Sequence, residues 1–213
     1  MNSFESAIVE GIQRISTPAL DWFFRIITAF GEVWIVLAVM GALIVFAGPK
    51  KALKYGIMAA VTFGVGQLLK HTVRRERPSS QFSENIDDLT QGGFTDGFAF
   101  PSGHTIVATV TAIFLCILFV KLVKPKWLKA LIIVGFTFFV LMVGFSRVYL
   151  GVHYLSDIIG AILITAVVYV ITSYVFEKCF NFVKRRFGFG EDDAGERDNK
   201  KARSKRKAVK SDV

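Results

Sequence analysis

The chain has 213 residues, of which 53% are hydrophobic, and its formal net charge is +9. Its mean hydropathy of +0.49 is high for a soluble domain, because such domains are only about 45–50% apolar. The composition therefore argues against a soluble globular protein. A basic chain can bind nucleic acid, but lysine and arginine also collect on the cytoplasmic side of membrane proteins. We expect a membrane protein with no nucleic-acid partner.

The first 31 residues form an N-terminal segment with a mixed pattern. Apolar side chains such as Ile8 and Ile12 alternate with charged ones such as Glu10. This spacing is typical of an amphipathic helix that lies in the membrane interface. Pro18 interrupts the pattern. The sequence leaves open whether the segment lies on the membrane or crosses it.

Five apolar blocks follow, and each approaches the length that spans a bilayer. They cover residues 33–48, 53–70, 104–122, 128–145 and 154–176. The predicted fold class is all-α: a polytopic membrane helix bundle with about five transmembrane helices, or six if the N-terminal segment spans, plus an amphipathic N-terminal helix. We assign residues 32–180 to the membrane domain. Residues 181–213 form a basic tail that we expect to be disordered.

The distribution of lysine and arginine predicts the orientation in the membrane. Basic turns near residues 50–54 and 121–129 fall on the same side as the C-terminal tail, which makes this side cytoplasmic. The polar stretch 72–100 and the turn at 147–153 fall on the opposite side. We therefore expect a multi-pass protein of the cell membrane with its polar residues gathered at the extracytoplasmic face.

Three cationic side chains occur at the extracytoplasmic ends of the predicted spans. Lys70 and Arg77 lie at the end of the second span, and Arg147 lies at the end of the fourth. Each alone would be an ordinary interfacial anchor, but ionisable residues gathered at one membrane face indicate function. Three cations directed at one place suit a bound phosphate.

One histidine at this face follows a helix-start motif, Pro101-Ser102-Gly103-His104. Ser102 is a natural N-cap residue for the helix that follows. The backbone amides after it lie at a helix N-terminus, where anions bind. The motif therefore adds a second phosphate-binding element and places His104 beside it.

A second histidine, His153, lies four residues before Asp157 at the start of the last predicted helix. Residues at this spacing share a helix face. A carboxylate bonded to one ring nitrogen leaves the other nitrogen free to attack. Two histidines with three cations fit phosphoryl transfer through a covalent intermediate, with one nucleophile and one acid–base group.

These residues fall into three motifs that resemble the signature of the type 2 phosphatidic acid phosphatase superfamily. The motifs are Lys70-x6-Arg77-Pro78, Pro101-Ser102-Gly103-His104 and Ser146-Arg147-x5-His153-x3-Asp157. The match keeps the order of the motifs and about eleven specified positions, which makes it far more specific than one short motif. It covers roughly residues 33–176, so the N-terminal segment and the tail lie outside it.

The resemblance implies a role for each residue. His153 would be the nucleophile and form a phosphohistidine, Asp157 would orient it, and His104 would protonate the leaving oxygen and then activate water. The substrate phosphate would be held by Lys70, Arg77, Arg147, Ser102 and the Gly103 amide. The resemblance implies no cofactor and no metal, and the sequence shows no acidic or Cys/His ligand cluster.

Other charged residues near the motifs are expected to have no catalytic role. His71 is expected to be interfacial, and Arg74 and Arg75 are expected to contact water or lipid headgroups. The aspartates between residues 87 and 96 are expected to be solvated in a loop, without forming a metal site. The basic tail is expected to contact anionic lipid.

The predicted function is hydrolysis of a lipid phosphate at the outer headgroup level. Undecaprenyl diphosphate is the first choice of substrate, followed by phosphatidylglycerophosphate and phosphatidate, and the loop at residues 79–100 is expected to select the headgroup. Two alternatives stay open. A vanadium haloperoxidase shares the signature, although such enzymes are soluble. A non-catalytic phospholipid-binding or lipid-transfer protein would need the phosphate-binding residues but not His153. The sequence does not indicate an oligomeric state.

Overall fold

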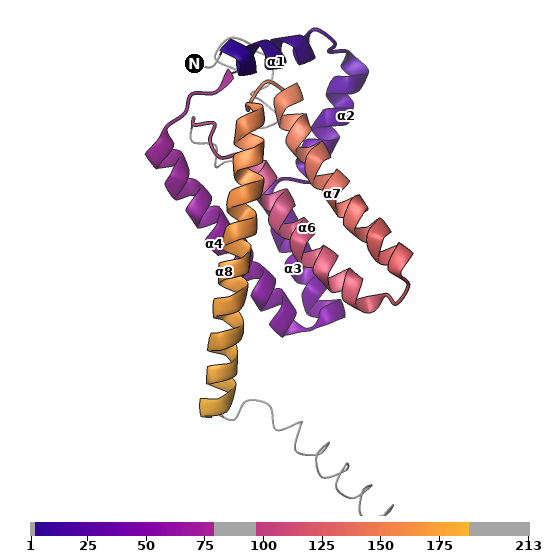
Figure 1. Ribbon diagram of the computed structural model, residues 1–213, viewed down its shortest axis with the longest axis vertical. Helices are drawn as coiled ribbons and strands as arrows, with labels where there is room; N and C mark the ends of the chain where they lie inside the picture. Colours follow the sequence, from indigo (N-terminus) through magenta and orange to yellow (C-terminus); the bar gives the residue numbers. More distant parts are fainter. Residues whose placement is uncertain (1–2, 79–96, 188–213) are drawn as a thin grey trace, which may run out of the picture. The chain divides into compact units, whose positions relative to one another are not determined.

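A computed structural model describes residues 3–78 and 97–187 of the chain (Figure 1). The described residues form seven helices: α1 (Ser3–Gln13), α2 (Pro18–Ala29), α3 (Val33–Ala47), α4 (Pro49–Val73), α6 (Gly103–Leu122), α7 (Lys126–Tyr149) and α8 (Leu155–Phe187). The chain forms two compact units, Met1–Thr172 and Ser173–Val213, and α8 contributes to both.

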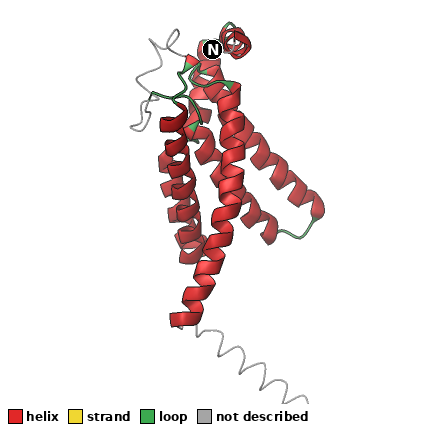
Figure 2. Cartoon of the chain, turned by 60° about the vertical axis from the view of Figure 1, so that its left-hand side comes forward, coloured by secondary structure: helices red, strands yellow, loops and turns green. Residues whose placement is uncertain are grey.

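Four of these helices, α4, α6, α7 and α8, are long and apolar enough to cross a membrane. The helices α2 and α3, which are bent by 51° at the break between them, are long and apolar enough only together, and they make a fifth span if the pair is counted as one. By contrast α1 has only 11 residues, or about 16 Å of helix, which is too short for a hydrocarbon core of about 30 Å. The structure confirms an all-α membrane helix bundle of up to five spans (Figure 2).

The helix boundaries follow local sequence signals. Thr17 caps α2 with its side-chain oxygen, and Pro18 occupies the first helical position, where its missing N–H costs nothing. Gly48 separates α3 from α4 at a φ of +92°, a conformation that favours glycine. Ser102 caps α6 by accepting a hydrogen bond from the Thr105 amide at 3.4 Å. These residues set where each helix begins and therefore which side chains face the polar end of the bundle.

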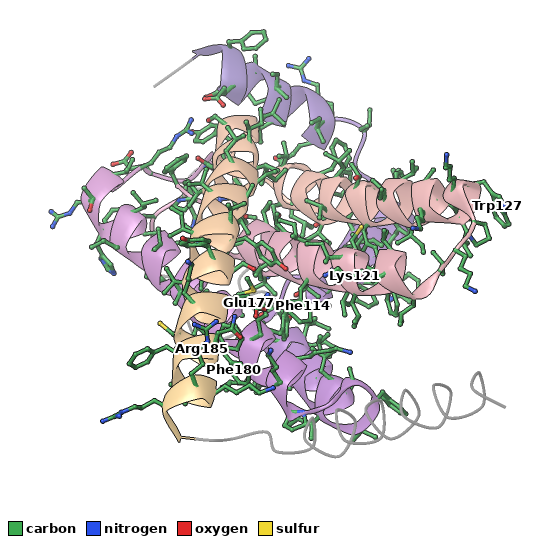
Figure 3. The ribbon with its side chains drawn as sticks, turned by 60° about the horizontal axis from the view of Figure 1, so that its bottom comes forward. Phe114, Lys121, Trp127, Glu177, Phe180 and Arg185 are labelled. Carbon is green, nitrogen blue, oxygen red and sulfur yellow. The ribbon has the colours of Figure 1, made fainter. Side chains whose placement is uncertain are left out.

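In the first unit, α6 is the central helix and packs against α3, α4 and α7. A core cluster between them contains Tyr55, Met58, Val110 and Phe114, and the Tyr55 hydroxyl is hydrogen-bonded to Thr111 at 2.7 Å. Large apolar side chains elsewhere are exposed, and Figure 3 shows one of them, Trp127, projecting from the end of α7. Exposed apolar surface on these helices is what a lipid environment requires.

The second unit contains the last part of α8, which extends beyond the predicted end at residue 176. Residues 177–187 contain no glycine or proline that would end the helix. The Phe176 ring stacks on the Phe180 ring, with centroids 5.8 Å apart. Basic residues at 184–186 occupy the last turn, where they complement the helix dipole. Residues 181–187 of the predicted tail are therefore helical. Residues 188–213 lie outside the described residues, and the predicted division into three segments stays a prediction.

The polar segments of the first unit meet at one end of its helices. There α1 lies across the connection between α7 and α8, close to the segments 74–78 and 97–102 (Figure 1). An isolated bridge between Glu76 and Phe98 joins these two segments, and the Ala99 amide donates to the Arg75 carbonyl at 2.7 Å. The basic turns at residues 48–54 and 121–129 lie at the other end.

Candidate functional site

A pocket at the polar end collects most of the residues that the sequence singles out. Six of the eight predicted site residues line it: Lys70, Arg77, Gly103, His104, Arg147 and His153. They come from the ends of α4, α6 and α7 and from the connections that follow α4 and α7. The three motifs, although far apart in sequence, therefore converge as predicted on one site.

Two of the cationic residues in the pocket are almost completely buried. Lys70 is 4% exposed and Arg147 is 1% exposed. Lys70 Nζ donates to the Phe98 carbonyl at 3.1 Å, and Arg147 Nη1 donates to the neutral Thr28 hydroxyl at 2.8 Å. A site that concentrates buried cations in this way is suited to bind an anion.

The Ser102-Gly103 motif contributes to the site in two different ways. The Ser102 hydroxyl is fully buried, does not line the pocket, and accepts hydrogen bonds from the Thr105 amide and the Thr105 hydroxyl. Its observed role is therefore to cap α6. Gly103 does line the pocket, and a Cβ at this position would meet no atom within 4 Å. Open space beside the Gly103 backbone leaves room for a ligand at the N-terminus of α6.

His153 lies in the short connection between α7 and α8. Gly151 allows the chain to turn here with a φ of +70°, and the Val152 amide donates back to the Arg147 carbonyl at 3.1 Å. The His153 side chain is only 2% exposed. The turn thus ties His153 closely to Arg147, the preceding residue of the third motif.

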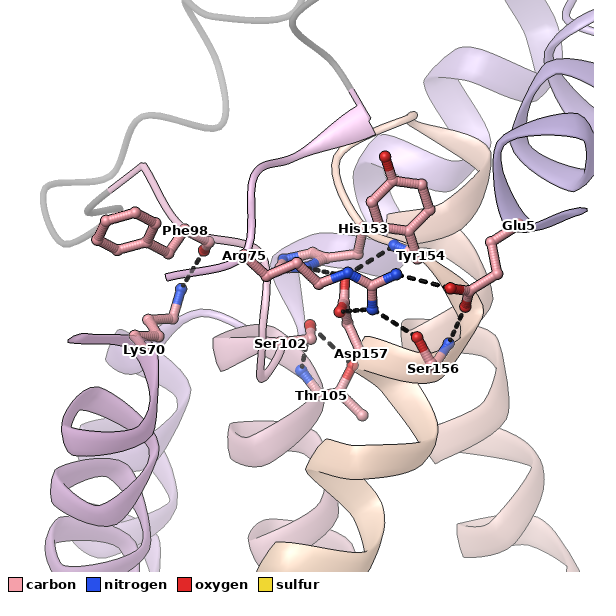
Figure 4. Close-up of polar contacts among 10 residues, drawn as sticks. All are labelled: Glu5, Lys70, Arg75, Phe98, Ser102, Thr105, His153, Tyr154, Ser156 and Asp157. Carbon is pink, nitrogen blue, oxygen red and sulfur yellow. Dashed lines mark hydrogen bonds and ion pairs between the residues drawn. The ribbon is translucent and has the colours of Figure 1, made fainter. Parts of the chain in front are cut away.

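Asp157 lies behind His153 at the start of α8 (Figure 4). Its Oδ2 accepts from the Tyr154 amide at 2.8 Å and lies 3.5 Å from His153 Nδ1. This separation is beyond a good N–H···O hydrogen bond, which is about 2.7–3.2 Å. The expected hydrogen bond between His153 and Asp157 is therefore not formed, although the two groups are adjacent.

The environment of His153 favours the neutral imidazole. Burial lowers the pKa of His153 well below its usual range, and the positive charges of Arg147, Arg77 and Lys70 lower it further. A neutral imidazole has a lone pair available for attack, whereas an imidazolium does not. The same cations that would bind a phosphate thus also keep the proposed nucleophile unprotonated.

The structure adds Glu32, which sequence reasoning missed. Glu32 lies at the break between α2 and α3, lines the pocket, and places Oε1 2.9 Å from His104 Nε2. A neighbouring glycine allows this approach, because a Cβ on Gly31 would lie 2.7 Å from the Cβ of His104. No motif in the sequence indicates this contact, since the two partners are 72 positions apart.

Arg75 corrects an expectation from the sequence. Its Nη1 donates to Asp157 Oδ1 at 2.7 Å, so it is not simply solvated or in contact with headgroups. The adjacent Arg74 is exposed and donates from Nε to the His71 carbonyl at 3.0 Å. His71 is also exposed and lies edge-on to the Phe98 ring. Of the two arginines, only Arg75 therefore contacts the predicted site.

Within residues 3–78 and 97–187, no three His, Cys, Asp or Glu side chains are grouped so that they could hold a metal ion. The aspartates between positions 87 and 96, and most of the loop expected to select the headgroup, lie outside the described residues. Independence from metal stays a prediction.

Several proteins of known function or structure are similar to this chain. An undecaprenyl-diphosphatase of Sulfolobus acidocaldarius is 28% identical over 66% of this chain. The match covers 63% of the length of that protein. A decaprenylphosphoryl-5-phosphoribose phosphatase of Mycobacterium tuberculosis is 29% identical over 77% of this chain and 86% of its own length. Phosphatidylglycerophosphatase B of Bacillus subtilis is 34% identical over 49% of this chain and 50% of its own length.

Solved structures share the fold. The transmembrane phosphatidylglycerolphosphate phosphatase of Bacillus subtilis superposes with a TM-score of 0.66 and 23% identity, over 87% of this chain and 88% of its own. Aquifex aeolicus LpxE superposes with a TM-score of 0.59 and 22% identity, over 78% and 92% of the two chains. The model of the PAP2 superfamily matches residues 51–181, which include all three motifs. The chain therefore belongs to the PAP2 superfamily.

Proposed function

We propose that this PAP2 superfamily enzyme hydrolyses the phosphate of a membrane lipid through a phosphohistidine intermediate and without a metal ion. The observation that carries the proposal is a pocket whose lining includes two histidines and three cationic side chains. Cations at a phosphoryl centre stabilise the charge on its equatorial oxygens in the transition state. The pocket lies at one end of membrane-spanning helices, so the tails of a lipid substrate can stay in the bilayer.

His153 is the nucleophile in this mechanism. Asp157 lies on the Nδ1 side of the ring, which leaves Nε2 to attack phosphorus. A P–N bond forms as the P–O bond to the lipid breaks. Lys70, Arg77 and Arg147 hold the phosphate oxygens, and the neutral state of His153 provides the attacking electron pair.

His104 is the acid and then the base. Glu32 lies 2.9 Å from Nε2 of His104, where a carboxylate keeps a proton on that nitrogen. As an imidazolium, His104 passes a ring proton to the leaving lipid oxygen in the first step and becomes a neutral imidazole. In the second step this neutral imidazole accepts a proton from water, whose oxygen attacks phosphorus as the P–N bond to His153 breaks, so that phosphate is released and His153 is regenerated.

Undecaprenyl diphosphate is our first choice of substrate, followed by phosphatidylglycerophosphate and phosphatidate. The names of the Sulfolobus and Bacillus relatives support two of these choices. The name of the Mycobacterium relative adds a lipid-linked phosphoribose to the candidates. We further propose that the pocket faces the outside of the cell membrane, because the basic turns lie at the opposite end of the bundle.

Phosphate release by the purified full-length protein in detergent tests the proposal. The panel contains undecaprenyl diphosphate, phosphatidylglycerophosphate, phosphatidate and a lipid A phosphate, each with EDTA present. We expect release that His153→Ala abolishes and that His71→Ala, which changes an exposed histidine, leaves intact. The ranking of kcat/KM identifies the preferred lipid. Release by His153→Ala at the wild-type rate would contradict the mechanism, and no release from any lipid would favour a non-catalytic lipid-phosphate-binding protein.

Vanadate provides an independent test of the phosphoryl-transfer chemistry. It adopts the five-coordinate geometry of a phosphoryl centre under attack, and such mimics bind more tightly than substrate. We expect competitive inhibition by vanadate. Full activity at millimolar vanadate would count against attack by His153.

A further inference from the structure

Arg75 connects three parts of the protein through its guanidinium group (Figure 4). Nη1 donates to Asp157 Oδ1 at 2.7 Å and to the Ser156 hydroxyl at 2.5 Å, and Nη2 donates to Glu5 Oε2 at 2.6 Å. The guanidinium carbon also lies 4.3 Å from the centre of the Tyr154 ring. Arg75 therefore joins the N-terminal helix to the carboxylate behind the proposed nucleophile.

Glu5 completes this network from the other side. Its Oε1 accepts a hydrogen bond from the Ser156 amide at 3.1 Å. That amide belongs to the first turn of α8, where backbone N–H groups lack partners within the helix and attract negative charge. Glu5 thus contacts both the start of α8 and the arginine that contacts Asp157.

The position of Glu5 is fixed by packing of α1. Val9 on α1 is 1% exposed and belongs to a cluster with Val148, Tyr154 and Ile158. Gln13, at the end of α1, lies against Gly151 in the turn that carries His153. The N-terminal helix is therefore part of the structure around the nucleophile, although it lies outside the three motifs.

Glu5 and Arg75 each favour the charged form of the other. Burial acts to raise the pKa of Glu5, but hydrogen bonds from Ser156 and Arg75 outweigh it and lower the pKa below its usual range. Burial acts to lower the pKa of Arg75, but the negative charges of Asp157 and Glu5 outweigh it and raise the pKa. The cation of Arg75 thus lies between two carboxylates, one of which is the partner of His153.

Asp157 consequently divides its oxygens among several partners. Oδ1 accepts from Arg75, and Oδ2 accepts from the Tyr154 amide and faces His153 Nδ1. Arg75 therefore holds the carboxylate in place and compensates part of the negative charge that would otherwise favour protonation of His153. Glu5 limits this effect, because it shares the same guanidinium group.

We propose that Arg75 and Glu5 are positioning residues that orient Asp157 and set how much of its negative charge acts on His153. The proposal rests on the phosphohistidine mechanism above. Neither residue touches the reacting atoms, so both act through Asp157.

The charges around the two groups determine the expected signs. His153 faces the cations Lys70, Arg77 and Arg147, the second histidine His104, and the carboxylate of Asp157. Asp157 faces His153, Arg75 and, beyond Arg75, Glu5. Loss of the Arg75 charge raises the pKa of His153, because less of the Asp157 charge is compensated. Loss of the Glu5 charge lowers the pKa of His153, because the positive charge of Arg75 then compensates more of the Asp157 charge.

The test is the pH dependence of kcat/KM at low ionic strength for the wild type, Arg75→Gln and Glu5→Gln, with one lipid phosphate. We expect Arg75→Gln to lower kcat about tenfold with little change in KM. Its acid limb should move up by about 0.5–1 pH unit, and that of Glu5→Gln should move down by a smaller amount. Because the substrate is the same throughout, its own ionisation cancels in these differences.

Matched controls remove the same charges nearby. Arg74→Gln changes the exposed neighbour of Arg75, and Glu10→Gln changes an exposed residue on α1. In both variants the acid limb of the kcat/KM profile should lie at the same pH as in the wild type. Arg75→Lys should restore the position of the limb through its charge but not kcat, because lysine lacks the forked geometry.

A structural role alone would lower activity or folded yield without moving the acid limbs in opposite directions. An unchanged limb in both Arg75→Gln and Glu5→Gln would overturn the proposal. If Arg75→Gln does not fold, Glu5→Gln decides alone: a downward shift supports the proposal and no shift overturns it. Wild-type activity that survives His153→Ala would instead refute the phosphohistidine mechanism, and this inference with it.

Discussion

The two histidines of the pocket each have a carboxylate neighbour, but the two carboxylates are engaged differently. Glu32 lies 2.9 Å from His104 Nε2, whereas Asp157 lies 3.5 Å from His153 Nδ1 and also accepts from Arg75 and the Tyr154 amide. Glu32 can therefore keep a proton on His104. Burial and the charges of Arg147, Arg77 and Lys70 keep His153 neutral beside the shared Asp157.

The difference shows that a nearby carboxylate does not by itself define the role of a histidine. Burial, neighbouring cations and the other partners of that carboxylate together decide whether the ring holds a proton or keeps a free electron pair. On this basis His104 suits proton transfer and His153 suits nucleophilic attack. Substitutions at the two histidines and at the residues around them test this contrast.

Replacing His104 should have the largest effect. We expect His104→Asn to reduce turnover of lipid phosphates about 10²- to 10⁴-fold, because no group protonates the lipid oxygen. An activated aryl phosphate, whose leaving group needs no proton, should still react in the first step. Stopped-flow detection should then show a burst of phenolate followed by slow turnover. Equal losses for both kinds of substrate, with no burst, would contradict the acid role, and His71→Asn is the control.

Removing the charge of Glu32 should have the next largest effect. We expect Glu32→Gln to lower kcat for lipid phosphates about 10- to 100-fold, because the proton on His104 is held less well. The loss should be smaller for an activated aryl phosphate. Steady-state kinetics with both substrates measures the difference. Glu76→Gln, which changes an exposed carboxylate, should behave as the wild type, and an equal loss on both substrates would point to damage of the pocket.

Filling the space at Gly31 should displace His104. A Cβ there would lie 2.7 Å from the His104 Cβ and 3.0 Å from its carbonyl oxygen. We expect Gly31→Ala to lower kcat about tenfold and to cost about 1–3 kcal/mol of stability through overpacking. Thermal unfolding and steady-state kinetics measure the two effects. Gly135→Ala, at a site with no atom within 4 Å, is the matched control, and wild-type behaviour of Gly31→Ala would mean that the close approach is unimportant.

The smallest effect concerns the pH dependence of stability. The pKa of His153 in the folded protein lies well below the 6.5 of an unperturbed histidine. Below pH 6.5 the unfolded chain therefore takes up a proton that the folded protein does not, and stability falls as the pH decreases. His153→Gln lacks this contribution, so the wild type should lose up to about 1.4 kcal/mol per pH unit relative to it. If the free energy of unfolding falls equally in both proteins between pH 6.5 and 5, the pKa of His153 is not lowered by folding.

Local signals in the sequence predicted much of the site. Ser102 caps α6 as its position after Pro101 predicts, and the four-residue spacing places Asp157 behind His153. Three spans, α4, α6 and α7, also agree with predicted blocks to within a few residues, because long apolar runs form membrane helices whatever their tertiary contacts. The first predicted block reaches the length of a span only together with α2, and α8 extends past its predicted end. Each of these features depends on residues that are near one another in the chain.

The charged partners of the two histidine regions could not be predicted in this way. Glu32 is 72 positions from His104, and Arg75 is 70 positions from Glu5 and 82 from Asp157. No helical or turn spacing relates such pairs, so only the packed bundle brings them together. For the same reason Arg75 and Arg74 look equivalent in the sequence, although only Arg75 reaches the site.

Trapping the covalent intermediate tests the central assignment most directly. The His104→Asn variant is mixed with an aryl phosphate carrying a radiolabelled phosphoryl group, quenched in alkali and digested. We predict label that is stable in alkali, labile in acid and located on His153, because without His104 the phosphohistidine forms but hydrolyses slowly. Label on another residue, or label that persists when His153→Ala is added to His104→Asn, would contradict the account.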